Sequence, residues 1–271
     1  MKTLLILALV ALAWPAFAQA PATKPETRIA LKGGTLIDGY GGVPIRNSVI
    51  LVQGERITAV GQEGTLAVTT PSAFGGTMGA SLTLNGGTLS LGSGTLTSGG
   101  IQLESNSTIE VGDGANVTID GTIDGSASLT KTGAGTLTLS GANSYQGTTT
   151  VAAGTLSVAA DGNLGTGAVT LDGGTLQVTS FATSSTPIDN DIVLGSGGGT
   201  IRVESGSFFK HSGIISGSGS LTKTGGSSLV LAGNDANTFT GTVIIDAGYL
   251  LALKSGALGQ GPEKRANGRG R

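Results

Sequence analysis

The sequence predicts an all-β protein, a parallel β-helix (solenoid) with a short N-terminal β-hairpin segment. Residues 129–156 return as residues 221–250, with Leu, Lys, Gly, Asn and an aromatic residue at matching places. The offset between the copies is 92 residues up to Gly233 and 94 residues beyond it. Apolar residues alternate within each copy, which is typical of strands with one buried face. Gly-Thr-Leu segments also recur about every twenty residues, the length of one coil.

A coil of this length cannot bury its apolar side alone, so successive coils must stack. We expect about nine coils over residues 75–259, with Leu, Val and Ile inside and Thr, Ser and Asn outside in ladders. A β-sandwich is the competing fold, but its core usually contains a Trp, and the single Trp14 lies near the N-terminus. A disordered linker would lack the regularly spaced aliphatic residues.

The N-terminus has the pattern of a secretory signal peptide over residues 1–18. Lys2 precedes an apolar run of eleven residues from Leu4 to Trp14, which is too short for a membrane span. Ala16-Phe17-Ala18 fits the small-x-small cleavage pattern, so we expect a cut after Ala18. This predicts a secreted, extracellular or cell-surface protein, with a Pro- and Thr-rich linker over residues 19–27.

Residues 28–70 form a separate segment. Alternation over 49–52 and 56–60 predicts a β-hairpin, which we expect to cap the first coil. Residues 28–64 resemble the opening strands of secreted amidohydrolases. That resemblance implies a small β-sandwich beside a metal-dependent barrel whose His-x-His pair binds metal. The pair is missing here, and the chain's one histidine is His211, so these residues cannot build the metal site.

The charge pattern gives no reason to expect a nucleic-acid partner. Residues 75–259 carry twelve acidic and five basic side chains, a net charge of −7. Residues 260–271 are basic, and we interpret them as a disordered tail. The chain has no Cys, which excludes disulfides and thiolate metal sites.

The matched turns contain the first candidates for binding. Asn143 and Asn237 precede Tyr145 and Phe239, respectively. The asparagines could contact a ligand, but we favour hydrogen bonds to turn backbone. The aromatic residues could form a sugar platform, and we favour packing in the turn.

Acidic residues supply a second set of candidates. The densest run could bind calcium through oxygen atoms, but its spacing fits no known calcium loop, and we favour a solvated face. The run consists of Glu110, Asp113, Asp120 and Asp124. Asp189 and Asp191 flank Asn190, and the three are interpreted as an inter-coil loop.

Catalytic groups are not evident. His211 has Lys210, Glu204 and Arg202 near it in sequence, and alternate positions could share a strand face, but no acid–base pair stands out. No serine lies in a nucleophile elbow, and the glycines 197–199 precede no helix. We therefore predict no catalytic, cofactor-binding or metal-binding residues, and no cofactor.

Both long copies resemble the passenger-associated repeat of bacterial autotransporters. The family pattern is a Leu-x-Lys-x-Gly start, a Gly-x-Leu-x-Leu strand, an Asn-x-Tyr/Phe-x-Gly turn and a closing Gly-x-Leu, and both copies keep it. The resemblance covers about 75–259 and implies a β-helical stalk exported by type V secretion in linkage to a C-terminal outer-membrane barrel. Only Gln260 to Arg271 follow, so we expect that this chain lacks the translocator.

The sequence thus predicts a non-enzymatic, secreted or surface-exposed passenger fragment acting as stalk or scaffold, with a role as adhesin. A host or neighbouring-cell surface would be its partner, and the mature chain would have no membrane span. One alternative is a carbohydrate-active β-helix enzyme, which would need carboxylates clustered on one coil face. Another is a degenerate amidohydrolase without its metal site.

Overall fold

The protein is all-β in this computed structural model, which describes residues 28–36, 45–53, 56–62, 65–68, 82–96, 100–179, 188–204, 206, 208–261 and 264–266. The described strands form four sheets, and the described part of the chain contains one short 3₁₀-helix, η2 (Asp161–Asn163). The predicted signal peptide and the linker over 19–27 lie outside the described residues.

The N-terminal sheet is antiparallel and has the order β1-β2-β3. Its strands are β1 (Arg28–Leu36), β2 (Ile45–Gln53) and β3 (Arg56–Gln62). The predicted hairpin is confirmed, because β2 pairs with β3 across the short connection between Gln53 and Arg56.

The other three sheets are parallel, and together they make a solenoid of about eight turns. Sheet 1 contains β4 (Thr65–Val68), β5 (Leu82–Leu91), β7 (Ile101–Val111), β9 (Ile123–Gly125), β10 (Leu129–Thr132), β12 (Thr149–Val151), β14 (Val169–Leu171), β16 (Ile192–Leu194) and β19 (Ile215–Gly217). Sheet 2 contains β6 (Gly94–Leu96), β8 (Asn116–Ile119), β11 (Thr136–Leu139), β13 (Thr155–Val158), β15 (Thr175–Val178), β17 (Gly199–Val203), β20 (Leu221–Thr224), β22 (Val243–Ile245) and β24 (Lys264–Ala266). Sheet 3 contains β18 (Phe208–His211), β21 (Ser228–Leu231) and β23 (Tyr249–Ala252).

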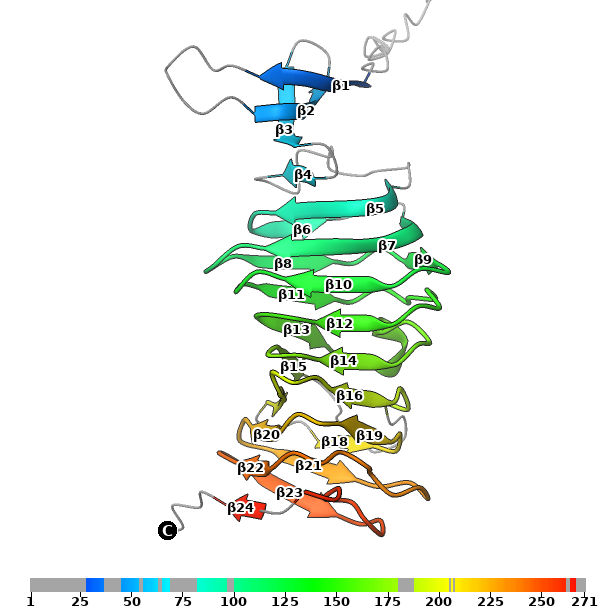
Figure 1. Ribbon diagram of the computed structural model, residues 1–271, viewed down its shortest axis with the longest axis vertical. Coiled ribbons are helices and arrows are strands. Elements are labelled where there is room, and N and C mark those ends of the chain that lie inside the picture. The colour runs from blue at the N-terminus through cyan, green and yellow to red at the C-terminus, as the bar shows by residue number, and fades with distance from the viewer. Residues whose placement is uncertain are drawn as a thin grey trace, which may run out of the picture.

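The coils stack along one axis, so that the solenoid is a rod (Figure 1). The N-terminal sheet lies at one end of the rod, and β23 and β24 lie at the other. The predicted parallel β-helix is therefore confirmed.

The core is a set of aliphatic columns that run along the rod. In sheet 2 the in-register residues of five successive coils are buried: Val117, Leu137, Leu156, Leu176 and Ile201. Each residue covers the one below it, so the column removes apolar surface from water continuously.

The outer faces of sheets 1 and 2 carry the predicted polar ladders. One ladder on sheet 1 consists of Thr88, Thr108, Thr130, Thr150 and Thr170. A second ladder, on sheet 2, consists of Thr136, Thr155, Thr175, Thr200 and Thr222. These side chains are half-buried, because each threonine lies between the threonines of the adjacent coils.

Coil length varies along the rod. The step between paired residues of sheet 2 is 20 residues from Thr155 to Thr175 but 25 from Thr175 to Thr200. Later coils also have a strand in sheet 3. The solenoid makes about eight turns, where the spacing predicts roughly nine.

The C-terminal segment differs from the prediction in one respect. The sequence predicts a disordered tail over 260–271, whereas Lys264–Ala266 forms β24 and pairs in parallel with β22. Strand pairing at the edge of a sheet uses backbone groups, so a segment poor in apolar residues can form it.

Candidate functional site: two matched repeats and an acidic groove

The lysine of each repeat is buried in the core. Lys131 lies in an aliphatic column between Ile109 and Val151, and Lys223 lies in another between Ile201 and Ile245. This placement follows from strand alternation, because the lysine is two residues after an inward-facing leucine in both copies.

Each buried lysine binds three carbonyl oxygens at the corner of the coil. Lys131 Nζ donates to Thr132 O at 2.7 Å, to Gly133 O at 2.8 Å and to Ala153 O of the next coil at 3.3 Å. Lys223 Nζ repeats this arrangement with Thr224 O, Gly225 O and Ala247 O, at 2.5, 3.0 and 3.1 Å. The lysine therefore joins two stacked turns from inside the rod.

The electrostatics are consistent with a structural ammonium. Burial lowers the pKa of Lys131 from 10.5 to about 8, and the Glu110 carboxylate opposes that shift. Burial likewise lowers the pKa of Lys223 to about 8. Both amines are still protonated at neutral pH, and an ammonium has three donors for the three carbonyl oxygens.

The glycine that follows each lysine is required by stacking. Gly133 and Gly225 have φ of 73° and 78°, a region that favours glycine. A Cβ atom would lie 2.2 Å from Val111 O at Gly133 and 2.2 Å from Val203 O at Gly225. The final glycine of the Leu-x-Lys-x-Gly start therefore lies at a corner of the coil where only glycine fits.

The matched asparagines connect three coils. Asn143 Oδ1 accepts a hydrogen bond from Ile123 N at 2.8 Å, and its Nδ2 donates to Asn163 O at 2.5 Å. Asn237 makes the same pair of bonds, with Ile215 N at 2.8 Å and Ala257 O at 2.6 Å. The structure shows both asparagines bonded to turn backbone, which is the interpretation that the sequence favours.

The aromatic residues that follow the asparagines are also interior. Tyr145 and Phe239 are fully buried, and Tyr145 Oη lies 2.6 Å from Thr149 Oγ1. Burial raises the pKa of Tyr145, and the hydrogen bond to Thr149 opposes the shift. Neither ring is available to stack on a sugar, so packing in the turn is their role.

The acidic residues 110–124 do not converge. Glu110 is on the outer face of sheet 1, and Asp124 accepts hydrogen bonds from Thr122 and Ser144. Within the ranges that the structure describes, no group of three or more His, Cys, Asp or Glu side chains could hold a metal ion. The amidohydrolase-type metal site therefore has no counterpart in those ranges.

His211 is separated from its sequence neighbours by strand alternation. It points into the core, where burial lowers its pKa to about 4, with the Lys254 ammonium adding to the shift. Its Nδ1 lies 3.1 Å from Ile188 O, and its buried Nε2 has no hydrogen-bond partner among the described residues. Arg202 and Glu204 form an ion pair of 2.7 Å on the outside, so these two side chains do not join His211 in the core.

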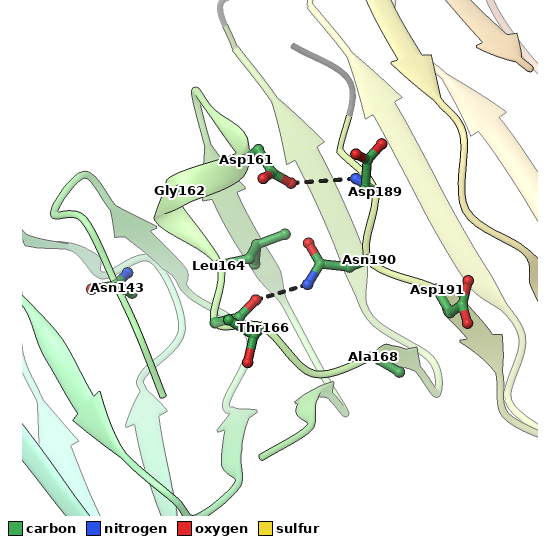
Figure 2. A pocket seen from close by; sticks show the side chains of 10 residues that line it. Asn143, Asp161, Gly162, Leu164, Thr166, Ala168, Asp189, Asn190 and Asp191 are labelled. Carbon is green, nitrogen blue, oxygen red and sulfur yellow. Dashed lines mark hydrogen bonds between the residues drawn. The ribbon is translucent and has the colours of Figure 1, made fainter. Parts of the chain in front are cut away.

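A groove between coils was not evident from the sequence. It has a volume of about 470 Å³, and its lining includes Asp161, Asp189, Asn190 and Asp191 (Figure 2). Asn190 Nδ2 donates to Gly165 O and Gly167 O, at 2.7 and 2.8 Å, which places it between coils as the sequence predicts.

The aspartates of the groove are used for structure. Asp161 Oδ1 accepts from Asp189 N at 3.3 Å, and Asp191 Oδ1 accepts from Ile214 N at 2.7 Å. Asp189 Oδ1 accepts from the Ser212 hydroxyl. Each carboxylate therefore fixes a loop between stacked coils.

The comparisons with known proteins agree with this geometry. The model of the passenger-associated-transport-repeat family matches residues 129–158 and 221–252. Two segments of the chain are thus similar to passenger-associated transport repeats. These matches coincide with the two segments that place Lys, Gly, Asn and an aromatic residue at equivalent points of the coil, so the predicted resemblance to autotransporter passengers is confirmed.

A curated relative is the protein described as "Adhesin BmaC autotransporter" of Brucella suis biovar 1 (strain 1330). It is 44% identical to this chain over 163 residues, which is 57% of this chain and 4% of the relative. The chain thus spans a small fraction of the relative's length. No solved structure matches the chain.

The resemblance of residues 28–64 to secreted amidohydrolases stays a prediction.

In the part of the chain that the structure describes, no helix is long and apolar enough to cross a membrane.

Proposed function

We propose that the chain is a segment of a secreted or surface-exposed autotransporter passenger, which acts as a non-enzymatic stalk and takes part in adhesion. One observation carries the proposal. Both matched repeats place their motif residues inside the rod, where they hold coils together, so the motif serves the architecture rather than a ligand.

The relative supports the adhesive role. The "Adhesin BmaC autotransporter" is described as an adhesin, and 57% of this chain aligns with it. We transfer adhesion to a host or neighbouring-cell surface from that description. The rod supplies the geometry, because a stack of coils displays its outer faces away from the membrane to which a passenger is linked.

Coil stacking also suits export in an unfolded form. Each coil contacts mainly the coils next to it, so folding can proceed coil by coil once the chain is outside the cell. The signal peptide over residues 1–18 would direct the first step, and mass spectrometry of the exported protein should find Gln19 as its first residue. The same proposal includes the domain limits that the sequence predicts. It also states that the chain has neither a nucleic-acid partner nor an enzymatic site.

The test is an adhesion assay with surface display. Residues 19–271 are fused to an autotransporter translocator and expressed in a non-adherent bacterial strain. We expect the rod to be accessible to protease on intact cells and to raise binding to epithelial cells above that of the translocator alone. Efficient display without increased binding would contradict the adhesive role.

An activity assay tests the non-enzymatic part separately. Purified protein is incubated with acidic polysaccharides, and release of unsaturated sugars is followed by absorbance. We expect no release of unsaturated sugars. Release at a rate proportional to protein concentration would contradict the non-enzymatic stalk and support the carbohydrate-active alternative.

A further inference from the structure

Strand β5 pairs irregularly with β7 near its middle. Leu84 pairs with Leu103 of β7. The next residue, Asn85, pairs with Ser105, so β7 has one extra residue at this point. Gly86 has φ of 73°, a region that favours glycine, and both Asn85 and Gly86 are exposed. This β-bulge therefore presents an asparagine–glycine pair to water.

Two serines of β7 contact this pair. Ser105 Oγ donates a hydrogen bond to Asn85 Oδ1 at 2.7 Å. Gly86 N donates to Ser107 Oγ at 3.2 Å, and Ser107 Oγ donates in turn to Ser105 O at 2.8 Å. The amide carbonyl of Asn85 and the backbone nitrogen of Gly86 are thus each held by a serine hydroxyl.

An asparagine amide can react with the backbone nitrogen of the residue that follows it, because the two close a five-membered ring. A Cβ atom on the following residue obstructs this attack, and Gly86 has none. The hydrogen bond from Ser105 stabilises the negative charge that develops on Asn85 Oδ1 during the attack. The bulge therefore combines an unobstructed nucleophile with an activated amide.

The other asparagines that the structure describes lack this combination, because each is followed by a residue with a side chain. Asn116 is the most useful comparison, since it is also exposed in a strand but precedes Val117. Asn143 and Asn237 are buried and bonded to turn backbone. The chain also contains an asparagine–glycine pair at 267–268, which lies outside the described residues.

We propose that Asn85 is a self-modification site of the folded rod, which converts to aspartate and isoaspartate without an enzyme. Gly86 N forms a bond to Asn85 Cγ, and the Cγ–Nδ2 bond breaks. The side-chain nitrogen leaves as ammonia with the proton from Gly86 N, and a cyclic imide remains.

Water, which reaches the exposed bulge, completes the reaction. Addition of water at Cγ breaks the bond from Cγ to Gly86 N and gives aspartate. Addition at the backbone carbonyl of residue 85 breaks the other carbon–nitrogen bond of the imide and gives isoaspartate. The inference does not depend on the adhesive role, because it concerns the chemistry of one coil.

The two products should affect the coil differently. Aspartate keeps an acceptor for Ser105 and adds one negative charge. Isoaspartate adds a carbon atom to the main chain, so Leu84 and Leu89 cannot both keep their partners on β7. The part of β5 before the bulge should therefore loosen as isoaspartate accumulates, and hydrogen exchange at Leu84 should become faster.

Peptide mapping of the full chain provides the test. The folded protein is incubated near neutral pH, mass spectrometry locates the change in mass, and an isoaspartyl methyltransferase detects isoaspartate. We expect both products at Asn85, formed faster at higher pH because Gly86 N must lose its proton. Asn116 should remain unchanged over the same period, and Asn267 is followed separately because it lies in a different tryptic fragment.

Variants of Ser105 test the activation of the amide. Ser105→Ala removes the hydroxyl, and conversion should slow by about fivefold, as expected for the loss of one ordinary hydrogen bond. Ser105→Thr keeps a hydroxyl and should restore the rate. Melting temperatures of both variants are measured, so that a change in rate is compared at equal stability. Asn85→Gln keeps an amide but would have to close a larger ring, and it should give no conversion over this period.

Three results would overturn the proposal. The first is absence of conversion at Asn85 in the folded chain, while a synthetic peptide of residues 82–91 does convert. The second is an equal rate in the parent chain and in Ser105→Ala at equal stability. The third is conversion of Asn116 as fast as that of Asn85, which would mean that exposure alone determines the reaction.

Discussion

The two repeats have the same local structure but occupy different faces of the rod. In the first repeat β10 and β12 belong to sheet 1, and β11 and β13 belong to sheet 2. In the second repeat β20 and β22 belong to sheet 2, and β21 and β23 belong to sheet 3. The second repeat is therefore advanced by one face of the coil relative to the first.

The intervening segment causes this change. β18 is added to the coil after β17, and β19 then continues sheet 1 by pairing with β16. The lysine, glycine and asparagine contacts are nevertheless reproduced in the second repeat. The repeat therefore specifies a corner between adjacent coils, whereas the face on which it lies depends on the residues that precede it.

The corner glycines should give the largest effect. We expect Gly133→Val and Gly225→Val each to destabilise the rod by about 4 kcal/mol, because a Cβ atom at φ near +75° would overlap a carbonyl oxygen of the preceding coil. Urea unfolding followed by circular dichroism measures the loss. Gly112→Ala is the control, since a Cβ atom there has nothing within 4 Å. A loss at one repeat only would show that the two corners are not equivalent.

The asparagines should come next. Asn143→Ala and Asn237→Ala each leave a buried backbone N–H and a buried carbonyl without their partner, and we expect a loss of about 2 kcal/mol in the free energy of unfolding. Thermal unfolding of the two variants under the same conditions provides the measurement. If either variant binds cells or sugars less well while its stability is unchanged, the asparagine contacts a ligand after all.

The buried lysines should make stability depend on alkaline pH. The pKa values of these lysines in the folded chain are about 8, below the ordinary lysine value of 10.5. Between pH 8 and pH 10.5 the unfolded chain therefore binds more protons than the folded chain. The free energy of unfolding should therefore rise as pH increases from about 8 to about 10.5. The double variant Lys131→Met and Lys223→Met should reduce this slope in urea titrations at pH 8 and pH 10, and Lys210→Met, on an outward position, should leave it unchanged.

His211 should have the smallest effect at neutral pH. It lies on β18, the strand that distinguishes the coil before the second repeat from the coils around the first. Its pKa in the folded chain, about 4, lies below 6.5, so stability should be fully present above pH 6.5 and should fall as pH decreases toward 4. His211→Gln should flatten the dependence in thermal melts between pH 4 and pH 7. If the variant keeps the same dependence of melting temperature on pH, protonation of carboxylates rather than of His211 causes that dependence.

The inward position of several residues of the candidate site was predictable from the alternation of side chains along a strand. Leu129 and Lys131 are two residues apart, so the inward position of the leucine also places the lysine inside, and the same argument applies to Lys223. The asparagines could be assigned to turn backbone because both precede an aromatic residue in a glycine-bounded turn. Carbonyl oxygens have no sequence signal, so the acceptors of the lysines could not be named in advance.

Other features required the stacked coils. The groove at Asp161 and Asp189 joins residues 28 positions apart, whose proximity depends on the length of the intervening coil. The same is true of β18, because Phe208–His211 resembles any other short strand until its neighbours are known.

The sequence by itself determined the parallel β-helix, its inside and outside, and the two repeats, because period-two alternation and glycine spacing are local properties of the chain. Only the tertiary structure decided the face on which each repeat lies and the carbonyl oxygens that each lysine binds. These depend on which residues of one coil lie on which residues of the next, and that register accumulates over every coil before it.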